Sequence, residues 1–248
     1  MSGEKMRNLC YLMLICVLFS SCSKRNPSLT IVTEEYPPLS YTENDSVKGY
    51  GTEIVQLIQR RIEDNAKINV MKWNEAYQLA LSKPNIVIYT IEKTKEREGL
   101  FYWIGPIGSN ETSVFIPRKK NIRINQFDDL KKFSSIATTT DWFTEEYLKI
   151  KGLNNLTSMP NPEDNVKMVM KGKSDATILT NVTYADIVKN AGYQVDDLKP
   201  VFHVMSSDFY IGISKLTDFK IVKKWKDAYD QMNQEGIIDS LQYKWKIK

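Results

Sequence analysis

The chain has 248 residues, of which 42% are apolar and 26% are charged, and its formal net charge is +4. This length and balance suit a globular protein of one large or two small domains. The charge is too small and too scattered to predict nucleic-acid binding, and lysine pairs such as Lys119–Lys120 are expected on solvated faces.

The first 22 residues are predicted to be a secretory signal. A positive start precedes an apolar run of about 11 residues from Leu9 to Phe19, which is shorter than the roughly 20 residues of a spanning helix. Cys22, at the end of "LFSSCS", resembles the lipid-attachment residue of bacterial lipoproteins. The alternative is an ordinary signal peptide with a chance cysteine. We expect a protein exported to the periplasm or cell envelope, lipid-anchored to a membrane at Cys22, with a polar tether over residues 23–28.

Strand and helix signals alternate along the first half of the remaining chain. The expected elements are a strand at 29–32, a helix capped by Thr52 and running to Ile62, a strand at 67–72, a helix from a cap at Asn74 to Leu81, and a buried strand at 86–89. This β-α-β-α-β order predicts a mostly parallel sheet with helices on its faces.

A second alternating unit follows. Its expected elements are a strand at 135–137, helices at 144–151 and 162–171, a strand at 176–179, a helix at 182–190, a strand at 209–213 and a helix at 220–233. The helix within "NPEDNVKMVMKG" is specified most completely, because Asn161 suits the cap, Pro162 the first turn and Gly172 the stop. We therefore expect two α/β units.

Residue sets typical of catalysis are scarce. His203 is the single histidine, so neither a histidine-rich metal site nor a Ser/His relay is predicted. The "GKS" at 172–174 follows a helix, whereas a phosphate-binding loop opens one. Acidic doublets such as Glu34–Glu35 are assigned to solvated loops. No catalytic residue, metal or cofactor is expected, which leaves binding chemistry.

Two stretches after early strands suit a binding site, "EEYPPLSY" (34–41) and "VKGYGTEIV" (47–55). Ligands of open α/β sheets lie beyond the carboxyl ends of the strands, where such loops gather. Tyr36, Tyr41 and Tyr50 offer flat apolar walls with a polar tip. The alternative is that these rings cover the edge of a core, and composition does not decide between the two.

Together with "TKEREGLFYWIGP" (94–106), these stretches resemble the bacterial extracellular solute-binding proteins that serve polar amino acid ABC transporters. The shared pattern is an aromatic-Pro-Pro loop, then a Gly-aromatic turn into a helix, then Thr-x-x-Arg leading into an aromatic strand. The resemblance spans essentially the whole chain after the signal. In the second half it rests on "SSIATTTDWFTEEYL" and "GKSDATIL".

The resemblance implies the two-lobed α/β fold of type II periplasmic binding proteins, with mostly parallel sheets and a two-strand hinge. Lobe 1 would contain residues 29–115 and 206–248, and lobe 2 residues 116–205. In such proteins the arginine at the Arg97 position clamps a ligand carboxylate, which suits a guanidinium because it donates two parallel hydrogen bonds. The aromatics at the Tyr36 and Tyr50 positions sandwich the ligand. The second lobe adds backbone N–H groups at a helix start, here near Thr139, Thr140 and Asp141.

The chain departs from the family pattern at three places. Thr180 stands where an aspartate usually pairs with the ligand's ammonium group, and Asp141–Trp142 replaces the usual Gly-Ser/Thr pair. Glu92 stands where a threonine often contacts the ligand. Asp141 and Glu92 are the candidate replacements for the ammonium anchor, and Trp142 either adds a stacking surface or covers the helix start.

The resemblance implies an exported, monomeric, lipid-anchored binding protein and not an enzyme. It would deliver a small carboxylate-bearing ligand, an amino acid or an organic acid, to an ABC transporter permease. One alternative is an enzyme on the same fold, a dehydratase of cyclohexadienyl acids with Glu92 or Asp141 as the general acid. The other is a ligand-sensing module.

Overall fold

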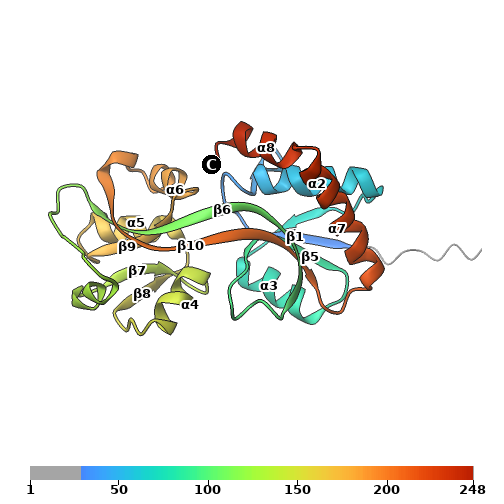
Figure 1. Ribbon diagram of the computed structural model, residues 1–248. Coiled ribbons are helices and arrows are strands. Elements are labelled where there is room, and N and C mark those ends of the chain that lie inside the picture. The colour runs from blue at the N-terminus through green and yellow to red at the C-terminus, as the bar shows by residue number, and fades with distance from the viewer. Residues whose placement is uncertain (1–28, 248) are drawn as a thin grey trace, which may run out of the picture.

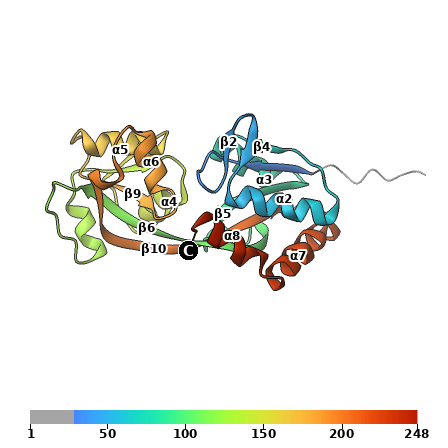
Figure 2. The ribbon, with the colours of Figure 1, turned by 90° about the horizontal axis from the view of Figure 1, so that it is seen from above.

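The computed structural model describes residues 29–247, so the predicted signal, the tether and Cys22 lie outside the described residues. Within that range no helix is long and apolar enough to cross a membrane. The elements form two lobes that lie side by side, connected by long strands (Figure 1, Figure 2).

Lobe 1 is built from the beginning and the end of the chain. Its elements are β1 (Thr30–Thr33), β2 (Tyr41–Glu43), β3 (Ser46–Lys48), α2 (Tyr50–Ile62), β4 (Ile68–Val70), α3 (Trp73–Ser82), β5 (Ile86–Glu92), α7 (Phe219–Gln234) and α8 (Ile237–Trp245). Strand β1 lies between β4 and β5 and is parallel to both. Helices α2, α7 and α8 cover one face of this sheet and α3 covers the other (Figure 1).

Lobe 2 repeats this arrangement with the middle of the chain. Its elements are η1 (Phe127–Lys132), β7 (Ile136–Thr139), α4 (Phe143–Ile150), β8 (Leu156–Met159), α5 (Pro162–Met170), β9 (Ala176–Thr180), α6 (Tyr184–Asn190) and η2 (Val195–Asp197). Strand β7 lies between β8 and β9 and is parallel to both. One face packs on α4 and η1, and the other packs on α5 and α6.

Two strands, β6 (Phe101–Pro117) and β10 (Leu198–Ser214), cross from one lobe to the other (Figure 1). They are antiparallel and complete one sheet in the order β4-β1-β5-β10-β6-β9-β7-β8. The α/β prediction is therefore confirmed, with three parallel strands in the sheet of each lobe and an antiparallel β2–β3 hairpin in lobe 1. The boundaries predicted at residues 115–116 and 205–206 fall inside β6 and β10, and the division there stays a prediction.

The sequence predicts some helix ends correctly and others wrongly. Helix α5 follows Asn161, begins at Pro162 and is succeeded by Gly172 with φ 69°, a left-handed conformation that favours glycine. Helices α2 and α3, in contrast, begin two residues and one residue before the caps predicted at Thr52 and Asn74. None of these three helices has a side-chain hydrogen bond at its N-terminal cap.

Candidate functional site

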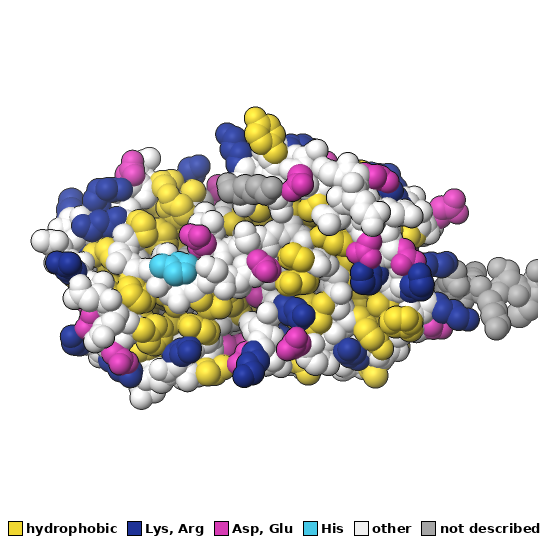
Figure 3. All heavy atoms as spheres, viewed as in Figure 1, with side chains coloured by type: hydrophobic (Ala, Val, Ile, Leu, Met, Phe, Trp, Pro, Cys, Tyr) yellow, Lys and Arg dark blue, Asp and Glu magenta, His cyan; other side chains and the backbone are white. Residues whose placement is uncertain are grey.

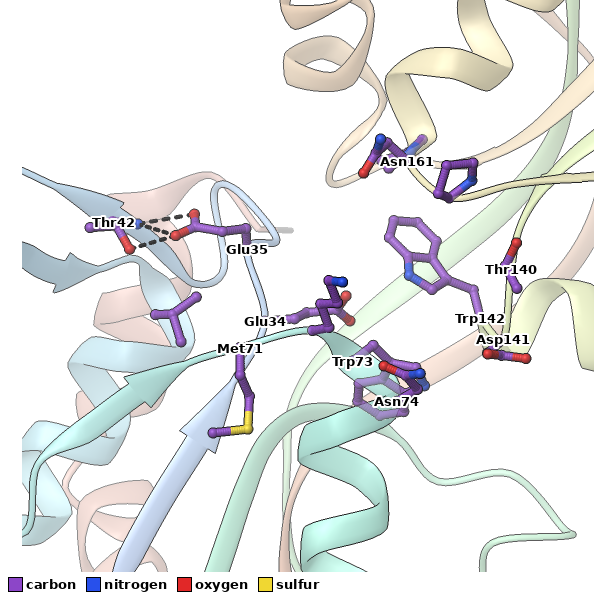
Figure 4. A pocket seen from close by; sticks show the side chains of 14 residues that line it. Glu34, Glu35, Thr42, Met71, Trp73, Asn74, Thr140, Asp141, Trp142 and Asn161 are labelled. Carbon is purple, nitrogen blue, oxygen red and sulfur yellow. Dashed lines mark hydrogen bonds between the residues drawn. The ribbon is translucent and has the colours of Figure 1, made fainter.

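The carboxyl ends of the parallel strands in the two lobes face each other across a cleft. Residues that directly follow β1 and β4 on one side, and β7 and β8 on the other, line one open cavity of about 800 Å³. Figure 4 shows this cavity, with the indole of Trp142 projecting between the lobes. Such an edge is the usual place for a ligand in an α/β sheet.

A second cavity adjoins the first and has a volume of only about 10 Å³, roughly the room for one water molecule. It is lined by Glu34, Tyr36, Trp73, Thr90, Glu92, Trp142 and Phe143. Thr90 has φ 60°, which is rare for a β-branched residue, and lies at a register shift between β5 and β10. Bulges and strained residues of this kind gather next to functional sites.

Arg97 is 2% exposed and lies at the contact between the lobes. Its Nη2 donates a hydrogen bond to Glu146 Oε2 of α4 at 2.9 Å, while its Nε and Nη1 are buried and have no hydrogen-bond partner among residues 29–247. The guanidinium carbon lies 5.2 Å and 5.0 Å from the ring centroids of Trp73 and Tyr77. Aromatic rings of lobe 1 therefore contact the guanidinium, and lobe 2 supplies a carboxylate that forms an ion pair with it.

Tyr36 also bridges the lobes. Its hydroxyl lies 3.3 Å from Thr180 Oγ1, and its ring meets Trp142 edge to face with centroids 5.3 Å apart. Burial raises the pKa of Tyr36 well above its usual range, with Glu92 adding to the shift, so the phenol stays neutral. Thr180 also shares a 2.8 Å hydroxyl contact with Thr183. The position expected to bind an ammonium group thus carries a neutral hydroxyl.

The structure corrects the prediction that Tyr50 faces a ligand. Tyr50 is fully buried in the core of lobe 1, and its hydroxyl donates a hydrogen bond to the carbonyl of Ile107. Tyr41 lies in the β2–β3 hairpin, outside the lining of both cleft cavities. Trp73, which follows β4 and starts α3, lines both cavities instead. Its position just after a strand was the available signal for this role.

Two carboxyl groups of lobe 1 point toward the small cavity. Burial raises the pKa of Glu34 to about 8; Glu92 adds to the shift, and Trp142 and the charge of Arg97 oppose it. Burial likewise raises the pKa of Glu92 to about 8, against the opposing charge of Arg97. Glu34 lies in a loop, as predicted, but its side chain is half-buried and lines both cavities.

The backbone N–H groups expected to bind an anion in lobe 2 are already bonded. Thr140 N donates to Met159 O at 2.9 Å, and Asp141 N donates to Glu145 Oε2 at 3.1 Å. The hydroxyl of Thr139 accepts a 2.8 Å bond from Asn165 Nδ2. In this structure Met159 and Glu145 therefore occupy the N–H groups of Thr140 and Asp141, and anion binding at the start of α4 stays a prediction.

Asp141 and Trp142 nevertheless line the open cavity. Asp141 has φ 61°, the left-handed conformation that suits the glycine expected at this place. Glu145 stays ionised: burial alone would raise its pKa, but hydrogen bonds from Ser158, Lys149 and its neighbours lower the pKa below the usual range. The start of α4 is thus a preformed turn that carries Trp142 into the cleft.

The family model for bacterial extracellular solute-binding proteins, family 3, matches residues 29–248. A probable amino-acid-binding protein, YxeM, of Bacillus subtilis (strain 168) is 21% identical over 232 residues, covering 91% of this chain and 87% of that protein.

Two solved structures are similar in fold. A histidine kinase sensor domain with similarity to periplasmic binding proteins superposes with a TM-score of 0.78 at 18% identity, over 88% of this chain and 95% of that chain. An ancestral arginine-binding protein bound to arginine superposes with a TM-score of 0.75 at 19% identity, over 88% and 97%. At these identities the likeness establishes the fold.

Proposed function

The chain belongs to the bacterial extracellular solute-binding proteins, family 3, and from that premise we propose that it captures a small carboxylate-bearing ligand between its lobes and delivers it to an ABC transporter permease. The family is described as solute-binding and the relative as amino-acid-binding, in agreement with the sequence prediction of a binding protein and not an enzyme. The dehydratase alternative is therefore not kept.

The observation that carries this proposal is the environment of Arg97. A guanidinium that is 2% exposed keeps two unpartnered nitrogen atoms, and its third nitrogen already binds a carboxylate, that of Glu146. Leaving such donors unpaired is costly in a buried site. A ligand carboxylate supplies the acceptors that Arg97 lacks, once the lobes part and Glu146 moves away.

Amino acids are the favoured ligand class. The relative from Bacillus subtilis is described as a probable amino-acid-binding protein, and one structural neighbour is an arginine-binding protein. Tyr36, Trp73 and Trp142 provide aromatic surfaces for the rest of such a ligand. Delivery to a permease distinguishes this role from sensing, so uptake of the bound ligand should stop when the gene is deleted.

Export and lipid attachment at Cys22 are part of the same proposal, because a tether keeps a binding protein near its permease. The support is the sequence alone: the apolar run and the "LFSSCS" ending. Fractionation of cells tests it. The Cys22→Ser variant should leave the membrane fraction, and an unchanged partition would contradict lipid attachment.

A thermal-shift screen tests the binding function. The panel contains the twenty amino acids and small organic acids, and a ligand that binds the folded state raises the apparent Tm. We expect at least one carboxylate-bearing compound to do so for wild type and not for Arg97→Ala. The control is Arg118→Ala, which removes an exposed arginine paired with Asp196; a shift that survives in Arg97→Ala would contradict the proposed anchor.

A further inference from the structure

An apolar patch lies on lobe 1 around the start of α7. Leu216 is 58% exposed and Phe219 is 62% exposed. The ring of Phe219 meets the ring of Tyr102 in β6, with centroids 5.9 Å apart. Leu100, which is 39% exposed, stands just before β6. Exposed apolar side chains that cluster, unlike isolated ones, mark contact surfaces. We call these four residues the α7 patch: Leu100, Tyr102, Leu216 and Phe219.

Lysines surround the α7 patch. Residues 215–224 contain four lysines and one aspartate, a net charge of +3. The Nζ of Lys215 lies 4.2 Å from the ring centroid of Tyr102. The aspartate, Asp218, caps α7 by accepting a hydrogen bond from the backbone N–H of Lys220. Among residues 29–247, three of these lysines form no ion pair: Lys215, Lys220 and Lys224.

This combination of apolar and basic side chains suits an anionic lipid surface. Figure 3 shows hydrophobic side chains beside basic ones on the end of lobe 1 that lies away from lobe 2. Apolar side chains enter the boundary between headgroups and acyl chains, and lysines near that boundary attract the negative headgroups. The α7 patch presents both features within one short segment of the chain.

The α7 patch also lies next to the start of β1. The backbone N–H of Thr30 donates a 2.9 Å hydrogen bond to the carbonyl of Asn85. The N–H of Asn85 in turn donates a 2.8 Å bond to Thr217 Oγ1. Thr217 stands between Leu216 and Phe219 in the chain. Two hydrogen bonds therefore connect the first strand of lobe 1 to the patch.

The distance along the chain from Cys22 limits how far this end of lobe 1 can lie from a membrane. Cys22 is seven residues before Leu29, and a fully extended chain of that length reaches about 25 Å. A lipid attached at Cys22 would keep the start of β1, and the α7 patch beside it, within about that distance of the bilayer. The bilayer surface is thus the partner that the attachment brings to the patch.

We propose that the α7 patch docks on the surface of an anionic lipid bilayer, with Leu216 and Phe219 among the headgroups and the neighbouring lysines on the lipid phosphates. This inference rests on the export and lipid attachment in the proposed function. The four patch residues lie outside the lining of both cleft cavities. Docking therefore leaves the cleft accessible and holds lobe 2 away from the membrane (Figure 1).

Flotation with lipid vesicles tests this assignment. The probe is the mature chain from residue 22, carrying Cys22→Ser so that no attached lipid contributes. Phosphatidylcholine vesicles with about 30% phosphatidylglycerol should bind it more tightly than vesicles of phosphatidylcholine alone. Binding should weaken between about 0.05 M and about 0.5 M salt, because salt screens the attraction of the lysines. Without an attached lipid the contact is weak and reversible, so this protein still leaves salt-washed cell membranes.

Variants of the patch separate its apolar and basic parts. Phe219→Ser should weaken binding to the anionic vesicles about 10-fold, because the apolar ring is lost from the contact. The triple variant Lys215→Gln, Lys220→Gln, Lys224→Gln should weaken binding roughly 100-fold at low salt, or about 5-fold for each lysine. The triple variant should also lose most of the salt dependence. Melting of each variant confirms that it is folded.

Matched controls come from lobe 2. Ile150→Ser removes an apolar side chain that is also 62% exposed. The second control combines Lys119→Gln, Lys171→Gln and Lys173→Gln, which removes three exposed lysines that form no ion pair within the described range 29–247. Both controls should bind vesicles as wild type does. Losses equal to those of the patch variants would overturn the proposal, because overall charge or apolar surface would then explain binding.

Other results would overturn lipid docking in favour of a different partner. If wild type binds washed cell membranes but vesicles of neither composition, a membrane protein covers the patch. A molecular mass that rises with concentration, and no longer does so in Phe219→Ser, would assign the patch to a second copy of this chain. Equal binding to neutral and anionic vesicles would contradict the role of the lysines.

The failure of this inference is distinguishable from the failure of the proposed function. The shift in Tm produced by the amino acid panel should be the same for Phe219→Ser and wild type, because the patch lies outside the cleft. If Cys22→Ser stays in salt-washed membranes, lipid attachment fails. If the patch variants and the lobe 2 controls bind vesicles equally, the docking surface fails and ligand capture stands.

Discussion

The ion pair between Arg97 and Glu146 joins the lobes, and Glu146→Gln should open the ligand-free protein. The bond is 2.9 Å long, with Arg97 2% exposed and the Glu146 side chain 47% exposed. Exposed pairs contribute less than about 1 kcal/mol and breaking a fully buried one costs about 3–5 kcal/mol, so we expect about 1–2 kcal/mol here. The ratio of closed to open molecules should fall roughly 5- to 30-fold.

Small-angle X-ray scattering of the ligand-free protein measures this change as a larger radius of gyration. The control is Asp227→Asn, which removes an exposed pair with Lys223 inside α7 and does not cross the cleft. A ligand carboxylate competes with Glu146 for Arg97, so the same variant should also bind such a ligand more tightly. A scattering profile equal to that of wild type would refute the idea that this pair holds the lobes closed.

Two further predictions concern stability. The pKa of Glu34 and of Glu92 is 4.5 in the unfolded chain and about 8 in the folded protein. Between these pH values the folded protein keeps protons on both groups, whereas the unfolded chain releases them. The free energy of unfolding should therefore fall as the pH rises from 4.5 to about 8. The slope is up to about 1.4 kcal/mol per pH unit for each group; urea unfolding should show a shallower slope for Glu92→Gln, and an identical slope would contradict the burial argument. Trp225 is fully buried in the core of lobe 1, so Trp225→Ala should lower the unfolding free energy by about 3–5 kcal/mol. Urea titration would contradict this if the midpoint moved no more than for a surface substitution.

The local sequence pattern predicts a helix or strand well where tertiary packing favours the same conformation. Ile86–Tyr89 is a β-branched and aromatic run, and β5 is buried along its whole length. Helix α5 carries its own start and stop in Pro162 and Gly172. The length of the crossing strands was not predicted, because the stretch "GSNETS" in β6 is polar and reads as a loop. Its strand conformation comes from pairing with β10, 90 to 101 residues away along the chain.

Some residues of the candidate site were predicted from the sequence and others were not. The resemblance to a family directs attention to Arg97 and Tyr36, and the structure places both at the contact between the lobes. It misdirects attention to Tyr50, because an aromatic residue after a glycine can equally well enter the core. Trp73 and Glu34 both follow strands, which is a signal for a binding role, but a single sequence does not show which strand ends meet in space, so neither residue was assigned to the site.

The central claim is that Arg97 binds the carboxylate of the ligand. Calorimetric titration of the best compound from the screen into wild type, Arg97→Ala and the control Arg118→Ala tests it directly. Loss of one partner from a buried, charged hydrogen bond should weaken binding by about 2–5 kcal/mol, or roughly 30-fold and more. We expect that loss for Arg97→Ala and unchanged affinity for Arg118→Ala. Equal affinity of wild type and a folded Arg97→Ala would contradict the account.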